Sequence, residues 1–340
     1  MLKCWKNISK FIDDWSDVFI KKLDIKTEKM TIKNADDAFG LWKSQFSRFC
    51  ANSIIYEYWI NNTDEIKDYI NQKTANGEAI IAKDNEKTLG YFIYDIFDFH
   101  GAKSAFISFV GNASISKNRY YIYTSLYRDI AEKWVSKGIL NHYISICVDD
   151  VEIKNALFEL GFGSYVVDAF SALSEIPSCE NSVIISIATI ADAEALYEIE
   201  KEAREYYSLS PIFLKKETDS FDEFTNFLKT NDILTAKNGE DIVGFMNVGI
   251  SDNDDIYLMK GKGFGGMGAY IKKAYRGMNI GSQLIAAVSE YYSSKSCSTI
   301  HVDWETANLY GNRFWQKYFT PTIISLKRTI HPDMIGKEVY

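Results

Sequence analysis

The pattern of apolar and polar positions repeats in the two halves of the chain. Residues 79–92 (AIIAKDNEKTLGYF) and 233–246 (ILTAKNGEDIVGFM) each combine an apolar run, a polar turn and a second apolar run, which is typical of a β-hairpin. Ala82, Lys83 and Gly90 recur in the second segment at a constant offset of 154 residues. Charge-rich helical sequence precedes each hairpin, and each is followed by a strand, a helix, a strand, a helix and a final strand. We therefore predict two copies of one folding unit.

The distribution of proline predicts where the two copies meet. The first of only four prolines is Pro177, inside the polar stretch SEIPSCENS, which is typical of a linker. We expect one unit over residues 28–177 and a second over 178–340. Apolar residues at helical spacing predict an additional helix within residues 1–27, and its mixture of acids and lysines favours packing on its own domain over membrane or partner binding.

The second half can be assigned in more detail. Thr189 and Asp192 form a capping-box pattern that opens the helix ADAEALYEIEKEAREYY. The elements expected after it are, in order, the helix DEFTNFLK, the hairpin, the strand FGGMGAYI, the helix SQLIAAVSEYY, the strand TIHVDWE, the helix NLYGNRFWQKY and the strand TIISLKRTI. This order predicts an α/β (α+β) fold of two tandem units, each a mostly antiparallel mixed sheet flanked by helices.

Composition and charge narrow the function classes. With 46% hydrophobic and 25% charged residues, the chain has the composition of a globular protein. A net charge of −8 disfavours nucleic acid as a partner. The sequence contains neither an apolar run near the roughly 20 residues of a membrane span nor a signal-peptide core. Five scattered cysteines without a C-x-x-C pair predict neither a disulfide framework nor a metal site, so we expect a reduced, cytoplasmic protein.

A glycine-containing turn, KKAYRGMNIG, joins the strand FGGMGAYI to the next helix. Such a turn aims backbone N–H groups and the positive end of the helix dipole at one point. Gly277 and Gly281 lack Cβ atoms, so a pyrophosphate can approach the main chain, and Arg276 adds a permanent cation. The pattern alone leaves two alternatives open: a phosphate-binding turn, or a turn that is glycine-rich for geometry only.

Two blocks of sequence carry a resemblance to a known family. IKKAYRGMNIGSQL resembles the acyl-CoA signature V-x-P-x-Y-R-G-x-G-I-G-x-x-L of the GNAT N-acetyltransferase superfamily, and ETANLYGNRFWQKYF resembles its second block, N-x-x-A-x-x-F-Y-x-K-x-G-F. The resemblance covers about residues 183–330. It implies that acetyl-CoA is the cosubstrate and that the primary amine of a small molecule or peptide attacks its thioester directly. Asn279 replaces the usual glycine, and asparagine tolerates the left-handed backbone such a turn needs.

The resemblance also implies roles for individual residues. Ile271 would offer main-chain groups to the pantetheine arm, and Asn308 would lie near the pantetheine or the acyl group. Trp315 stands where the family usually has a tyrosine acid, and an indole N–H cannot release a proton near neutral pH. The implied donor-binding residues are Ile271, Arg276, Gly277, Met278, Asn279, Ile280, Gly281, Ser282, Asn308 and Trp315.

Candidates for catalysis and acceptor binding lie outside the turn. Asp303 and Glu305 share one face of the strand TIHVDWE, with Glu305 the first candidate for a base or amine anchor and Asp303 the second. The alternative is that both are solvated or helix-capping carboxylates. Tyr318 is a candidate substitute acid. Arg204 and Tyr207 are candidates for acceptor binding, although a helix C-terminus also favours a surface arginine such as Arg204.

The first half resembles a worn copy of the same domain. Aligned on the arginines, SKNRYYIYTSLYRD at 116–129 falls over the phosphate turn and places bulky or β-branched side chains opposite the glycines. ALFELGF still resembles the end of the second block. We predict a domain that keeps the fold without the donor site and shapes the acceptor cleft. Gly281→Tyr is then expected to abolish acetyl-CoA binding, and Thr124→Tyr to leave it intact.

Three functions compete at this point. The leading one is an acetyl-CoA-dependent N-acetyltransferase with a small amine acceptor. A non-catalytic acyl-CoA sensor is favoured by Trp315 and by the lack of an obvious base. A tandem-GNAT aminoacyl transferase that uses charged tRNA is disfavoured by the net charge and by the CoA-type turn.

Overall fold

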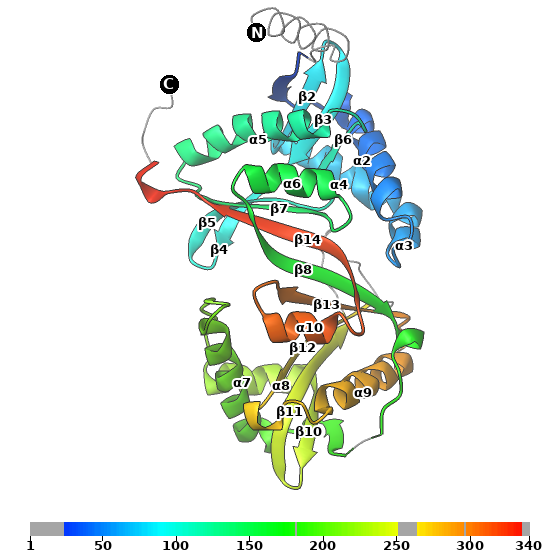
Figure 1. Ribbon diagram of the computed structural model, residues 1–340, viewed down its shortest axis with the longest axis vertical. Helices are drawn as coiled ribbons and strands as arrows, with labels where there is room; N and C mark the ends of the chain where they lie inside the picture. The colour runs from blue at the N-terminus through cyan, green and yellow to red at the C-terminus, as the bar shows by residue number, and fades with distance from the viewer. Residues whose placement is uncertain (1–23, 181, 251–263, 296, 335–340) are drawn as a thin grey trace, which may run out of the picture.

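The computed structural model describes residues 24–334 except 181, 251–263 and 296 (Figure 1). The predicted N-terminal helix lies mostly outside the described residues. The first described strand begins at Lys26, inside the range 1–27 assigned to that helix. Among the described residues, no helix combines the length and apolar character needed to cross a membrane.

The C-terminal half contains the predicted elements in the predicted order, whereas in the N-terminal half three strands rather than one separate the hairpin from the next helix. The N-terminal half contains β1 (Lys26–Lys29), α2 (Ala35–Phe49), α3 (Tyr56–Asn61), α4 (Thr63–Asn76), β2 (Ala79–Asp84), β3 (Lys87–Ile93), β4 (Asp95–Phe99), β5 (Ala102–Ile107), β6 (Asn112–Ser114), α5 (Arg119–Ser136), β7 (Asn141–Cys147), α6 (Val151–Glu159) and β8 (Gly163–Ala172). The C-terminal half contains β9 (Ile184–Ile187), α7 (Ala193–Ser208), α8 (Phe221–Thr230), β10 (Asp232–Asn238), β11 (Asp241–Ile250), β12 (Phe264–Ile271), α9 (Ile280–Ser294), β13 (Thr299–Glu305), α10 (Leu309–Trp315) and β14 (Thr320–Thr329). The predicted strands FGGMGAYI and TIHVDWE coincide with β12 and β13, so the α/β fold class is confirmed.

The two copies begin with the same local structure. In the second half, Thr189 and Asp192 form the predicted capping box around a single 3-10 turn before α7. Thr31 and Asn34 form an equivalent capping box around a 3-10 turn before α2. Each box satisfies backbone donors that a helix start leaves without partners. The repeat is therefore present in cap geometry as well as in sequence.

The two hairpins have equivalent registers, including a β-bulge at the same position. Ala82 pairs with Gly90 in the first and Ala236 with Gly244 in the second, and a β-bulge follows the alanine in both. A Cβ atom on Gly90 would lie 2.9 Å from the carbonyl oxygen of a neighbouring strand, and one on Gly244 would lie 3.0 Å from such an oxygen. The glycines recur because both sheets bring backbone too close for a side chain.

The last strands of the two halves cross into one shared sheet. Within the described part of the chain, ten strands follow the order β4-β5-β7-β14-β8-β13-β12-β11-β10-β9, and β1, β2, β3 and β6 form a second sheet. Figure 1 shows β14 lying beside β7 of the N-terminal half, while β8 lies between β14 and β13. Each copy is thus completed by a strand of the other. One buried apolar cluster continues through the junction, from Ile144 to Trp304 and Leu326.

The parallel pair β12 and β13 positions the site. Their ladder is limited to Phe264 opposite Thr299 and Gly265 opposite Ile300. β12 continues to Ile271 while pairing with β11 on its other edge. Past the short ladder, residues of both strands border a cleft.

Candidate active site

A cleft of about 450 Å³ lies at the C-terminal ends of β12 and β13. It brings together most of the residues implied for donor binding with the end of α7 and the beginning of α10. Its lining includes Tyr206, Tyr207, Tyr270, Ile271, Arg276, Gly277, Asn279, Ile280, Gly281, Ser282, Asp303, Asn308, Arg313, Phe314, Trp315 and Lys317. A volume of this size is typical of small-molecule sites.

The turn before α9 has the backbone geometry that the sequence predicts. Gly277 has φ +81°, and Asn279, the N-cap of α9, has φ 60° and ψ 11°. Ile280, Gly281 and Ser282 form the first helical turn, where amides have no carbonyl four residues earlier inside the helix. Because these three residues line the cleft, the N-terminus of α9 presents unpaired donors and its positive dipole end there.

Cationic side chains surround this end of the cleft, in a chain of net charge −8. They are Lys272 and Lys273 in the turn and Arg276, Arg313 and Lys317 in the lining. Such a concentration of positive charge attracts a phosphorylated ligand.

Arg276 lies inside the cleft rather than at the turn's outer surface. Its guanidinium is 4.9 Å from the ring centre of Tyr206 and 5.3 Å from that of Tyr270. Its Nε donates a hydrogen bond to the carbonyl oxygen of Ile271 at 3.0 Å. The main-chain acceptor implied for the pantetheine arm is therefore occupied by a side chain of the same turn.

Asn308 holds two elements of the cleft together. It is the N-cap of α10, and its Oδ1 accepts hydrogen bonds from the Gly311 amide at 3.0 Å and from the Tyr206 hydroxyl at 2.9 Å. The end of α7 is thereby fixed to the start of α10. Trp315 lines the same cleft and is 6% exposed, as part of the apolar core.

Gly281 is required by packing between helices. A Cβ atom there would lie 2.7 Å from the ring of Phe314 on α10. A large residue at this position would therefore disturb α9 and α10 as well as the cleft, so Gly281→Tyr does not separate loss of ligand from loss of folding.

Asp303 and Glu305 have different environments. Asp303 faces the cleft with an exposed side chain, although protein surrounds the carboxylate. This desolvation, and the nearby carboxylate of Asp168, raise the pKa of Asp303. Glu305 is 9% exposed, and its Oε1 lies 3.1 Å from the ammonium of Lys216. Of the two candidates on this face of the strand, Asp303 thus faces the cleft and Glu305 is held in an ion pair.

The exchanged strand β8 contributes side chains from the N-terminal half. Asp168 lies directly opposite Asp303 in the β8–β13 ladder, and its Oδ1 accepts a hydrogen bond from His301 Nε2 at 3.0 Å. Tyr165 of β8 lies near Asp303 and Glu305, and burial raises its pKa. Neither residue could be predicted from the sequence, because no local signal marks a strand of one copy as the neighbour of a strand of the other.

Four predicted site residues are not in the cleft lining: the ion-paired Glu305 described above, and Arg204, Met278 and Tyr318. Arg204 bonds Glu200 through Nε at 2.6 Å and borders a separate pocket of about 80 Å³, so it is not positioned to hold a ligand in the cleft. The side chain of Met278 is 57% exposed. Tyr318 donates its hydroxyl to Ser282 Oγ at 2.7 Å, and it therefore supports the first turn of α9. Tyr207, in contrast, lines the cleft as expected.

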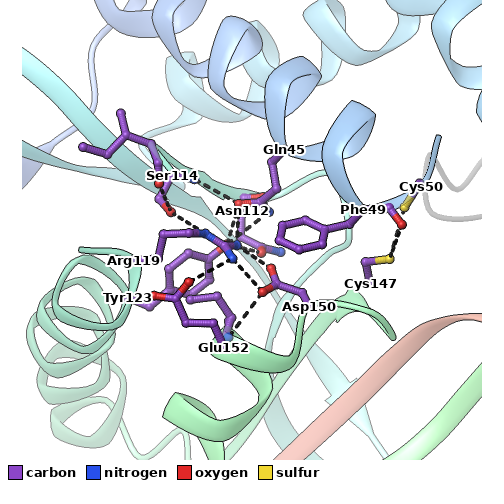
Figure 2. A network of polar contacts seen from close by, with 12 residues as sticks. Gln45, Phe49, Cys50, Asn112, Ser114, Arg119, Tyr123, Cys147, Asp150 and Glu152 are labelled. Atoms are coloured by element: carbon purple, nitrogen blue, oxygen red, sulfur yellow. Dashed lines mark hydrogen bonds and ion pairs between the residues drawn. The ribbon is translucent and has the colours of Figure 1, made fainter. Parts of the chain in front are cut away.

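The N-terminal half fills the corresponding region with a buried polar network (Figure 2). Arg119 is 1% exposed and makes a two-bond ion pair with Asp150, one bond being 2.7 Å from Nη1 to Oδ1. Its Nη2 donates to Gln45 Oε1 at 3.0 Å and its Nε to Ser114 Oγ at 3.4 Å. A guanidinium thus occupies space among elements equivalent to those around the C-terminal cleft.

Asn112 joins the two strands that border this region. Its side-chain amide donates to the carbonyl oxygen of Ser145 on β7 at 2.9 Å, and its Oδ1 accepts from Tyr123 at 2.8 Å. The pocket remaining beside it is about 10 Å³, against about 450 Å³ in the C-terminal half. In the described part of the first copy, these contacts fill the region that the cleft occupies in the second copy.

The alignment of the two turns on their arginines was wrong. Asn118, with φ 59°, is the N-cap of α5, as Asn279 is of α9, and the two are 161 residues apart. The turn before α5 is therefore four residues shorter, and Arg119 is the first residue of a helix. The counterpart of Gly281 is Tyr120 rather than Thr124.

Comparison with known proteins agrees with this geometry. A sequence model described as the acetyltransferase (GNAT) family matches residues 193–319, which span the cleft, the turn, α9, β13 and α10. The C-terminal half thus contains a GNAT-family domain. None of the curated proteins matches the chain.

Solved GNAT structures share the fold over nearly the whole chain. A GCN5-related N-acetyltransferase from Sphaerobacter thermophilus is 11% identical with a TM-score of 0.54, over 93% of this chain and 98% of that one. The glucosamine N-acetyltransferase region of a fungal multi-domain GH3 β-N-acetylglucosaminidase is 12% identical with a TM-score of 0.53. That match covers 91% of this chain but 38% of the fungal one. At such identities the likeness is one of fold.

Proposed function

We propose that the chain is an acyl-CoA-dependent N-acetyltransferase that binds acetyl-CoA in the C-terminal cleft and acetylates the primary amine of a small molecule or peptide. One observation carries the proposal. A single cleft joins the unpaired amides of the first turn of α9 to the cleft-facing side chain of Asp303. The first suits a pyrophosphate and the second suits an amine.

The charges along the cleft support this orientation. The turn and the end of α10 supply the cations, whereas Asp303 in the lining, with Asp168 and Glu305 near it, makes its side of the cleft anionic. A phosphorylated donor and an ammonium acceptor would therefore enter from complementary ends. Arg276 would have to leave Ile271 for the donor to use that main-chain group.

Asp303 is the proposed general base. Acetyl-CoA would supply an activated thioester, but an aliphatic ammonium, with a pKa of about 10.4, must lose a proton before its nitrogen can attack. Asp303 faces the cleft, and its raised pKa makes it a better proton acceptor than an ordinary carboxylate. The departing thiol, with a pKa of about 8.5 for a cysteine-like group, needs no strong acid, so Trp315 is compatible with turnover.

Ser282→Asp tests donor binding without adding a side chain at the tightly packed Gly281. A carboxylate in the first turn of α9 favours the helix dipole, and it can still accept the hydrogen bond from Tyr318, but it repels a pyrophosphate. Tyr121→Asp is the matched control, because Tyr121 is the third residue of α5 as Ser282 is of α9, and it is 55% exposed.

The measurement is thermal unfolding with and without acetyl-CoA. A ligand at about 100 times its dissociation constant stabilises by about 2.7 kcal/mol, which raises the melting temperature by several degrees. We expect this shift in the wild type and in Tyr121→Asp, and its loss in Ser282→Asp. An equal shift in both variants would place the donor elsewhere. Binding without release of thiol from acetyl-CoA in the presence of amines would favour a non-catalytic acyl-CoA-binding protein.

A further inference from the structure

The ammonium of Lys216 occupies a small cage next to the cleft, between Glu305 and the cleft-lining Tyr207. Its Nζ lies 3.1 Å from Glu305 Oε1 and 3.6 Å from the centre of the Tyr207 ring. A carboxylate together with an aromatic face is the usual environment for binding an ammonium group. Burial and the neighbouring carboxylate of Glu305 raise the pKa of Tyr207, so the two walls of the cage lie close together.

Lys216 reaches this cage from an irregular segment between α7 and α8. The segment is attached near its ends, where the Leu214 amide donates to the Tyr207 carbonyl at 2.8 Å and the Asp219 carbonyl accepts from Tyr197 at 2.9 Å. Residues 215 and 217–220 are exposed, whereas the Lys216 side chain is 29% exposed. The contact of this stretch with the cleft is therefore made by one flexible side chain, which another ammonium could displace.

The cage lies beside the proposed base, on the same strand. Asp303 and Glu305 are two residues apart on one face of β13, which separates their Cα atoms by about 7 Å. Asp303 is positioned to take a proton from a reacting amine, while Glu305 is positioned to keep an ammonium charged. Asp168 adds a third carboxylate nearby, so the region favours more than one positive charge.

We propose that Lys216 is an internal occupant of an acceptor subsite, and that the acceptor is an aliphatic diamine whose second ammonium displaces Lys216 from Glu305 and Tyr207. This inference rests on the proposed N-acetyltransferase function and specifies its substrate class. The reacting amine lies at Asp303, and the second amine, about four methylenes away, takes the cage. Lys216 thereby lowers the affinity for any acceptor that uses the cage.

Binding of 1,4-diaminobutane tests the proposal without turnover. Calorimetric titration is carried out at low ionic strength on the full chain, with and without CoA, and n-butylamine is the probe that lacks the second ammonium. Lys216→Met removes the internal occupant. Lys215→Met is the matched control, because this neighbour carries the same charge on the same segment and is exposed.

We expect Lys216→Met to bind 1,4-diaminobutane about tenfold more tightly than the wild type, as for a subsite that is free about one tenth of the time. Lys215→Met should remain within about twofold of the wild type, because the charge of an exposed side chain is screened by solvent and salt. Adding Glu305→Gln to Lys216→Met should remove the gain. Butylamine affinity should change little in any variant.

Two results would overturn the proposal. One is equal diamine affinity in Lys216→Met and Lys215→Met, with both variants folded as judged by thermal unfolding. The other is an equal gain for butylamine and the diamine, which would mean that charge alone was altered. Failure of the proposed function would appear differently, as an absence of acetyl-CoA binding, and the titrations without CoA would still report on the cage.

Discussion

Arg119→Met is expected to destabilise the protein while leaving the donor cleft intact. The Arg119 and Asp150 side chains are each 1% exposed, and the guanidinium also bonds Gln45 and Ser114. Methionine retains the apolar part of the side chain but removes the charge. Asp150 would keep its bond from the Ile153 amide at 3.3 Å, without a cation beside it.

The magnitude follows from leaving a buried carboxylate unpaired. Removing one partner of a buried ion pair costs about 3–5 kcal/mol, because the remaining charge has lost its solvent and its counter-ion. A loss of this size lowers the melting temperature by roughly 10 °C. Arg119→Met with Asp150→Leu removes both charges and should recover much of the stability, since an apolar pair can replace a buried ion pair.

Urea unfolding followed by circular dichroism gives the free energy of unfolding for the three proteins. Acetyl-CoA affinity is measured on the same samples below the transition and should be unchanged, because the network lies in the other half of the chain. A cost below about 1 kcal/mol for Arg119→Met would refute the description of this ion pair as buried. Loss of acetyl-CoA binding in a folded variant would refute its assignment as a filler of the unused cleft.

Three further predictions concern titration and packing. Burial lowers the pKa of His142 from 6.5 to about 4, so its contribution to stability is present above pH 6.5 and is lost as the pH falls toward 4. Urea unfolding should therefore show that the wild type loses about 3 kcal/mol of unfolding free energy between pH 7 and pH 4, and that His142→Gln does not show this loss. The raised pKa of Asp303 has the opposite effect on stability, because the wild type loses stability as the pH rises through that pKa. Asp303→Asn should therefore gain stability relative to the wild type from pH 4 to pH 8, while its rate of acetyl transfer falls about 10²- to 10⁴-fold. Gly281→Ala should cost about 1–3 kcal/mol in urea unfolding, because its Cβ meets the Phe314 ring at 2.7 Å; a neutral effect would show that α10 yields freely.

Local signals in the sequence determined the elements and the turn. The capping box of Thr189, the hairpin glycines and the left-handed Asn279 each depend on backbone geometry within a few residues, so the residue type at one position is enough to predict them. The same reasoning identified the cleft-lining turn. It failed for the turn of the N-terminal copy, because matching arginines carry less information than the left-handed asparagine that fixes where α5 begins.

Only the tertiary structure decided which segments meet across the cleft. A strand with alternating apolar and polar residues can pair through its backbone edge with a strand of either copy. Nothing local in the sequence therefore specifies that β8 pairs with β13 and brings Asp168 beside Asp303. The contact of Lys216 with Glu305 likewise joins an irregular segment to a strand nearly ninety residues later. The sequence by itself therefore determined the folding units and the turn before α9. The acceptor side of the cleft was decided by long-range packing, because the side chains that form it are far apart in the sequence and meet only in the folded interior, where the dielectric constant is low.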